Sequence, residues 1–150
     1  MQRPAAVLAF LLSLAVTAAA AVPKVDFDRV AGDAARKATK LYLQEGLAGL
    51  RDAFDGCMRD AARSKSPAAA TSCAATGWTM VYLDLLAVDA LHIPPTIDVS
   101  ATSKRISAAM VAAGRTADDA RRLRPFVMQF VDMGLTDAPA TVTARAGDKT

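Results

Sequence analysis

Two cysteines flank a break between helices, and this pair limits the fold more than any other feature of the chain. Cys57 and Cys73 are the only cysteines, and Pro67, which cannot continue a preceding helix, lies between them. Two thiols and the single histidine, His92, make a poor zinc site, because structural zinc normally takes four nitrogen or sulfur ligands. The pair therefore predicts one disulfide, which would join two antiparallel helices and add about 3 kcal/mol to the free energy of unfolding.

The amino terminus has the pattern of a secretory signal peptide, which fits an oxidising compartment. Arg3 precedes the apolar stretch Leu8–Val16, and small residues follow it at the position where signal peptidase needs them. We expect residues 1–21 to be removed, by cleavage after Ala20 or Ala21, which leaves a periplasmic or secreted chain. The uncharged stretch is too short to cross a bilayer comfortably, and no cysteine near the cleavage site could carry a lipid. We therefore expect no stable membrane insertion after cleavage.

Charge and composition exclude some classes of protein and favour helices. The 18 Lys and Arg nearly balance the 15 Asp and Glu, and they form no long basic run, so nucleic acid is not an expected partner. Aromatic residues make up only 5% of the chain. A core of Leu, Val, Met and Ala favours closely packed helices over a sandwich or a barrel. The abundance of Ala, Arg and Asp is typical of bacterial, GC-rich coding.

Apolar residues recur at helical spacing along the chain, and no segment alternates with the period of a strand. Before Pro67 two apolar series are out of phase between Leu41 and Leu43, which predicts two helices or one helix kinked near Gly46. We therefore predict an all-α fold, a small bundle of four to five helices stapled by one disulfide, followed by a disordered tail. The expected helices cover about residues 25–41, 43–62, 70–92, 98–113 and 116–134, the domain covers 22–135, and the tail covers 136–150.

The third expected helix should be the centre of the bundle, and the disulfide should fix what it faces. Its portion from Trp78 to Ile93 is apolar nearly all round, as in a helix covered on several sides. With Cys57 opposite Cys73 in an antiparallel pair, Asp84 comes opposite Gly46. We expect that carboxylate to be at least partly buried, with space beside Gly46 for it or for a water.

Four residues of this helix are the candidate ligand-binding residues: Trp78, Tyr82, Asp84 and Asp89. Two carboxylates in an apolar helix suggest acid/base chemistry, but about 140° separates them around the helix, and cooperating side chains are normally three or four residues apart. The alternative is that each carboxylate is hydrogen-bonded or paired with arginine, and that Trp78 and Tyr82 belong to the core. His92, in the last turn, fits a capping or surface role.

Arg121, Arg122 and Arg124 form the candidate partner-binding cluster, which would anchor an acidic partner. The alternative for them is a solvated helix face.

No catalytic or cofactor motif is present, so we expect no enzyme, no metal and no cofactor. The leading hypothesis is an exported, non-enzymatic interaction module, such as an inhibitor, an immunity factor or an envelope adaptor, with a protein partner. The alternative is a periplasmic carrier that holds a small apolar ligand between helices, near Trp78, Tyr82, Met110 and Phe126. An enzyme with Asp84 or Asp89 as general base is the third hypothesis, and it requires a cleft.

Overall fold

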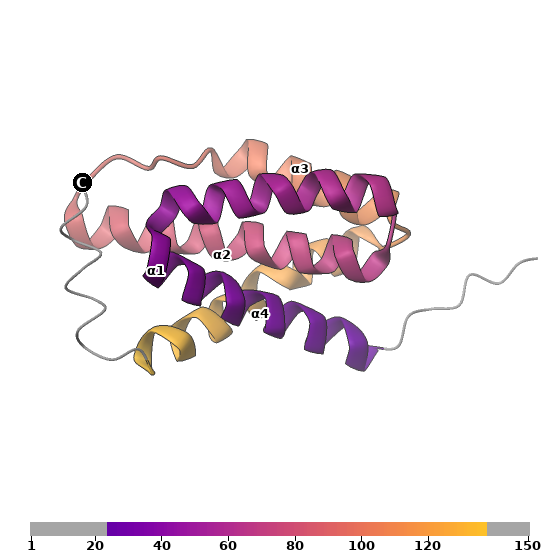
Figure 1. Ribbon diagram of the computed structural model, residues 1–150, viewed down its shortest axis with the longest axis horizontal. Coiled ribbons are helices and arrows are strands. Elements are labelled where there is room, and N and C mark those ends of the chain that lie inside the picture. Colours follow the sequence, from indigo (N-terminus) through magenta and orange to yellow (C-terminus); the bar gives the residue numbers. More distant parts are fainter. Residues whose placement is uncertain (1–23, 138–150) are drawn as a thin grey trace, which may run out of the picture.

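The computed structural model describes residues 24–137, which form four helices and no strand (Figure 1). The predicted all-α bundle of four to five helices with one disulfide is confirmed. The predicted signal peptide, 1–21, lies outside the described residues, as does the predicted tail from residue 138 onward. The helices are α1 (Lys24–Ser64), α2 (Pro67–Leu91), α3 (Val99–Ala112) and α4 (Ala117–Thr136).

The three later helices each begin at a polar residue that caps the backbone. The Ser66 side chain accepts a hydrogen bond from the third residue of α2, and Pro67 takes the first helical position, where its missing N–H has no cost. Asp98 caps α3 in the same way, and Thr116 belongs to a capping box at the start of α4. The start of α2 therefore lies about three residues before the predicted start near Ala70, because Ser66 and Pro67 already supply the cap.

The last helix is longer than its sequence predicts. Pro125 lies inside α4 without ending it, and the helix continues through Gly134, its predicted end, to Thr136. Gly134 lies against Thr39 of α1: a Cβ atom at position 134 would be 3.2 Å from the Thr39 Cγ2 atom. The glycine therefore permits a close approach between α1 and α4 rather than the end of a helix.

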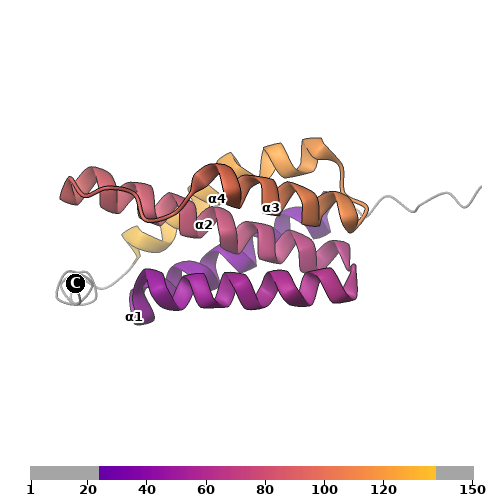
Figure 2. The same cartoon turned by 90° about the horizontal axis from the view of Figure 1, so that it is seen from above.

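The helix α2 is the centre of the molecule and packs against each of the other three helices (Figures 1 and 2). By length and composition alone α2 could cross a membrane, but half of its apolar window is buried in the bundle. The covered part differs from the predicted one. Burial runs from Ala70 to Asp84, whereas Leu91 is 58% exposed, because the end of α2 projects past the helices that cover its middle.

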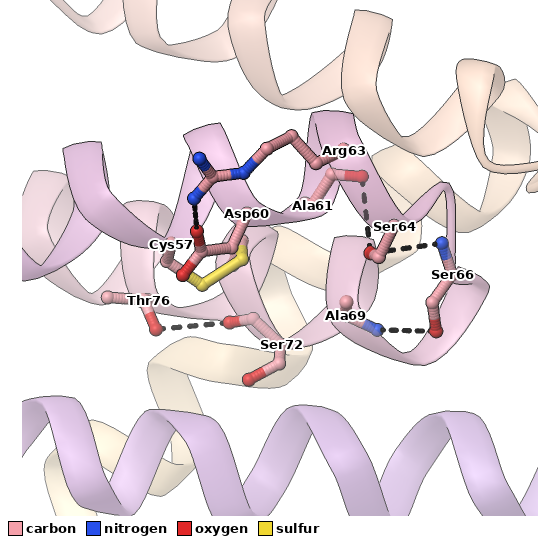
Figure 3. Close-up of a disulfide and its surroundings, with 10 residues drawn as sticks. Cys57, Asp60, Ala61, Arg63, Ser64, Ser66, Ala69, Ser72 and Thr76 are labelled. Carbon is pink, nitrogen blue, oxygen red and sulfur yellow. Dashed lines mark hydrogen bonds and ion pairs between the residues drawn. A yellow bond between two sulfur atoms is a disulfide. The ribbon is translucent and has the colours of Figure 1, made fainter.

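The disulfide joins α1 to α2 near the loop between them (Figure 3). The Cα atoms of Cys57 and Cys73 are 5.4 Å apart, within the usual range for a disulfide. The predicted register holds further along the pair, since a Cβ atom at Gly77 would come 2.5 Å from the Phe54 Cε2 atom. A disulfide of this kind is consistent with an oxidising compartment.

The predicted kink in α1 is confirmed and lies at Gly46, which has φ 73° and ψ −168° inside the helix. That region of backbone space is essentially restricted to glycine. The kink turns the two halves of α1 apart. The half after Gly46 runs beside α2, and the half before it crosses beside α4 (Figure 1).

Replacing Gly46 with alanine is expected to lower the free energy of unfolding by about 2 kcal/mol, because alanine is strained in this backbone conformation. The added Cβ atom would meet no other atom within 4 Å, so the loss comes from the backbone alone. Gly56→Ala is the matched control in the same helix. A Cβ atom there has its nearest neighbour, Arg59 Nη2, at 3.8 Å, so it should gain up to about 1 kcal/mol from helix propensity. Urea unfolding of both variants measures the difference. A Gly46→Ala variant as stable as Gly56→Ala would show that the kink does not need glycine.

Candidate ligand-binding site

A cavity of about 330 Å³ lies where α1 kinks, between the residues around Gly46 and the last turns of α2. Figures 1 and 2 show the course of the backbone around it. The kink ends the contact of α1 with α2, while α2 continues beyond it and the loop 92–98 runs back alongside (Figure 2). Most of the lining is apolar, and a few polar groups reach it. The apolar lining includes Leu43, Leu47, Leu83, Ala87, Leu91 and Ile93, and the polar residues are Tyr42, Gln44, Glu45, Asp84 and Thr96.

Asp84 holds the loop that closes one side of this cavity. The side chain is buried, with Asp84 only 3% exposed. One carboxylate oxygen, Oδ2, accepts hydrogen bonds from the backbone N–H groups of Thr96 at 3.0 Å and Ile97 at 2.9 Å, and Oδ1 accepts from the Thr96 hydroxyl at 2.7 Å. Arg51 donates to the Thr96 carbonyl oxygen from the other side. The expectation that this carboxylate is at least partly buried is therefore confirmed, and it lines the same cavity as Gly46. Its partners are loop donors rather than an arginine.

Tyr42 brings a second polar group to the cavity. Burial raises the pKa of the Tyr42 hydroxyl above its ordinary value of 10.0, and the negative charge of Asp84 raises it further. The structure records no hydrogen bond for that hydroxyl among residues 24–137. The group is therefore a protonated phenol at neutral pH, free to donate or to accept.

Both tyrosines of the chain are expected to ionise above pH 10.0 in the folded protein. The pKa of Tyr82 is raised by its hydrogen bond to Asp132, then by burial and by the charge of that carboxylate. Because both pKa values are higher in the folded state than in the unfolded chain, the protonated tyrosines contribute to the free energy of unfolding. This contribution is complete below pH 10 and is lost as the pH rises through the folded-state pKa values.

Ultraviolet titration of tyrosinate measures these two pKa values. Tyr82→Phe leaves Tyr42 as the only signal, and Asp132→Asn should lower the pKa of Tyr82 alone. Ionisation at the same pH in the folded and urea-unfolded chains would contradict both assignments.

The other three candidate ligand-binding residues lie away from the cavity. Trp78 is buried, with the Arg124 guanidinium 5.3 Å from its ring centroid. Tyr82 donates a hydrogen bond to Asp132 at 2.8 Å. Asp89 is exposed and has no ion-pair or hydrogen-bond partner within the described part of the chain. Of the four, the structure brings only Asp84 to the cavity.

Two residues of the predicted ligand site near Trp78, Tyr82, Met110 and Phe126 are closely packed. Met110 is fully buried, and the Phe126 ring packs on Phe130 with centroids 4.9 Å apart. None of these residues lines the cavity at the kink or the smaller one beside Phe54 and Arg105. In the smaller one, Arg105 is paired with Asp55 at 2.8 Å.

The three candidate partner-binding arginines are exposed, and each contacts another side chain of the chain. Arg121 pairs with Asp118 one turn earlier in α4. Arg122 lies over the Phe27 ring, 5.5 Å from its centroid, and Arg124 lies over Trp78. The three arginines therefore contact three different side chains: Asp118, Phe27 and Trp78.

Most of the residues that line the cavity were not predicted from the sequence. Tyr42, Leu91, Ile93 and Thr96 were not among the candidate residues, although the predicted pairing of Gly46 with Asp84 pointed to this end of the bundle. Within residues 24–137 no three His, Cys, Asp or Glu side chains gather in a way that could hold a metal ion.

No protein-family model matches the chain, and no curated protein or solved structure is significantly similar to it.

Proposed function

We propose that this chain is a non-enzymatic binding protein that holds a small apolar ligand in the cavity at the α1 kink. The observation that carries the proposal is the cavity itself, which exists because Gly46 adopts a backbone conformation closed to other residues. Its volume of about 330 Å³ lies at the lower end of the range for small-molecule sites, about 300–1,000 Å³. Such sites are mostly apolar with a few placed polar groups, as this one is.

The polar groups of the cavity support binding rather than catalysis. Both oxygens of Asp84 accept hydrogen bonds that hold the loop 92–98, so the carboxylate has a structural task. A general base must reach a substrate proton and be free to take it. No histidine, cysteine or lysine lies among the described lining residues to serve as its partner.

Export is part of the proposal. The signal-peptide pattern of residues 1–21 and the Cys57–Cys73 disulfide both support a periplasmic or secreted location in a bacterium. In such a compartment, a protein that shields an apolar molecule from water would act as a carrier.

We place binding at the cavity rather than at the arginine cluster. An inhibitor, immunity factor or adaptor that binds a protein through Arg121, Arg122 and Arg124 was the leading hypothesis from the sequence. Each of these guanidinium groups already lies against another side chain, whereas the cavity offers apolar walls to a ligand.

The fluorophore N-phenyl-1-naphthylamine, which is apolar and uncharged at neutral pH, tests the proposal. We expect saturable binding of one molecule per chain, seen as enhanced fluorescence. Ala87→Phe places a ring in the cavity and should weaken binding at least about tenfold, since filling the site removes the apolar contact that stabilises the complex. Ala90→Phe is the matched control, because Ala90 lies on the same helix but is exposed and does not line the cavity.

Two results would overturn the proposal. One is the absence of saturable binding to the native chain. The other is equal binding by Ala87→Phe and Ala90→Phe, which would place the fluorophore elsewhere on the molecule.

A further inference from the structure

The buried carboxylate of Asp84 has neutral partners only. Its three hydrogen-bond donors are two backbone N–H groups and one hydroxyl, and no salt bridge in the described part of the chain includes it. A buried charge is normally matched by an opposite charge, because removing it from water is costly. Asp84 therefore lacks a countercharge within residues 24–137.

The same carboxylate retains room for one more donor. An ionised carboxylate offers about four acceptor positions, and the three bonds to the loop leave one of them on Oδ1, which accepts only from the Thr96 hydroxyl. Since Asp84 lines the cavity, a donor group of a bound ligand can reach this position.

The other charged residue of the described lining is also acidic. Glu45 also lines the cavity, and no lysine, arginine or histidine does so among the described residues. The chain as a whole carries a net charge of +3, so this acidic lining runs against the charge of the protein. The raised pKa of Tyr42, part of which comes from Asp84, records the negative field inside the cavity.

An apolar surface adjoins these carboxylates. Leu91 and Ile93 line the cavity and are 58% and 39% exposed, although large apolar side chains gain stability when they leave water. A ligand that covers them must have an apolar body and reach the carboxylates at the same time.

On the basis of the proposed function, we infer that the ligand is a cationic amphiphile, with a protonated amine beside Asp84 and Glu45 and an apolar chain against Leu91 and Ile93. The ammonium group would supply the missing countercharge, donate to the free acceptor position of Asp84, and donate to the Tyr42 hydroxyl oxygen. An amphiphile with a carboxylate head would meet two like charges and should be rejected.

Three probes of equal chain length separate the head group from the apolar body: octylamine, 1-octanol and octanoate. At pH 7 the first is a cation, the second is neutral and the third is an anion. Titration calorimetry with the native, disulfide-bonded chain should give a dissociation constant for octylamine at least about tenfold below that of octanol, with octanoate weaker still, as expected for a partly buried charge pair. Added salt should weaken octylamine binding and leave octanol binding unreduced.

Two variants test which carboxylates produce the preference for octylamine over octanol. Asp84→Asn keeps the shape of the side chain and should remove most of the preference for octylamine over octanol. Because Asp84→Asn also changes a residue that holds the loop, Glu45→Gln provides a second test at an exposed position, where the preference should fall about threefold. Asp60→Asn is the control, since Asp60 lies fifteen residues after Glu45 in α1, roughly 22 Å away, and pairs with Arg63.

The outcomes distinguish this inference from the proposed function. If octanol binds and octylamine binds no better, the cavity is an apolar site without charge preference, and the inference fails while the proposed function stands. If the preference survives in both Asp84→Asn and Glu45→Gln, the inference also fails. If none of the three probes binds, the proposed function fails and the inference with it.

Discussion

Replacement of Asp84 by alanine is expected to lower the free energy of unfolding by about 4 kcal/mol, since it removes three hydrogen bonds to a charged acceptor and leaves a buried donor unpaired. The Ile97 N–H group is buried with its residue and has Asp84 as its acceptor. Without the carboxylate, the loop 92–98 must either bury that group unsatisfied or detach from α2. Detachment would expose Ile97, which is 7% exposed in the native fold.

Asp89→Ala is the matched control for this prediction. Asp89 lies five residues further along the same helix, is exposed, and has no partner within residues 24–137, so its replacement should change stability by no more than about 0.5 kcal/mol. Thr96→Val should fall between the two, at about 1 kcal/mol, because it removes only the hydroxyl donor. Urea unfolding of the three variants at neutral pH gives the comparison. An Asp84→Ala variant as stable as Asp89→Ala would mean that the carboxylate does not hold the loop.

The sequence predicted the fold well because each helix is specified by residues near one another in the chain. Pro67 ends one helix and starts the next, and the kink follows from a phase slip of the apolar residues at a glycine. The disulfide then added one long-range constraint. It was enough to predict that Asp84 and Gly46 lie at the same end of the helix pair, and both line the cavity.

The cavity could be predicted only in part, because it depends on where α1 and the loop 92–98 stop packing against α2. The direction of the kink and the return of the loop 92–98 along α2 are tertiary features with no local pattern. Thr96 and Ile97 contribute donors to Asp84 from twelve and thirteen residues away. Nothing in a sequence that reads Pro94-Pro95-Thr96-Ile97 indicates that this loop folds back.

The sequence was a poor guide to side chains that have both an apolar and a polar part, because the two parts can lie in different environments. Trp78 and Tyr82 are one turn apart, yet one is buried beneath Arg124 and the other reaches Asp132. The arginines were expected to face either solvent or a partner. They are exposed, and Arg122 and Arg124 in addition lie over the rings of Phe27 and Trp78, as the long stems of such side chains allow.

Removal of the disulfide, by the double change Cys57→Ser and Cys73→Ser, is expected to lower the free energy of unfolding by about 3 kcal/mol. The cysteines are 16 residues apart, and a closed loop of about that length restricts the unfolded chain by this amount. A second cost arises in the folded state, because Cys73 is 1% exposed and serine brings a hydroxyl into its place. Urea unfolding without reductant should show the full difference between native and variant chains.

The controls for this prediction separate the bond from the substitution. A reductant should destabilise the native chain and leave the double variant unchanged, since the variant has no thiol to reduce. Ligand binding provides the second control. Gly46 is eleven residues from Cys57 along α1, roughly 16 Å, so the folded variant should bind N-phenyl-1-naphthylamine with native affinity. A variant that stays folded but no longer binds would show that the disulfide shapes the cavity, whereas one of native stability would show that the bond adds nothing to the packing of α1 against α2.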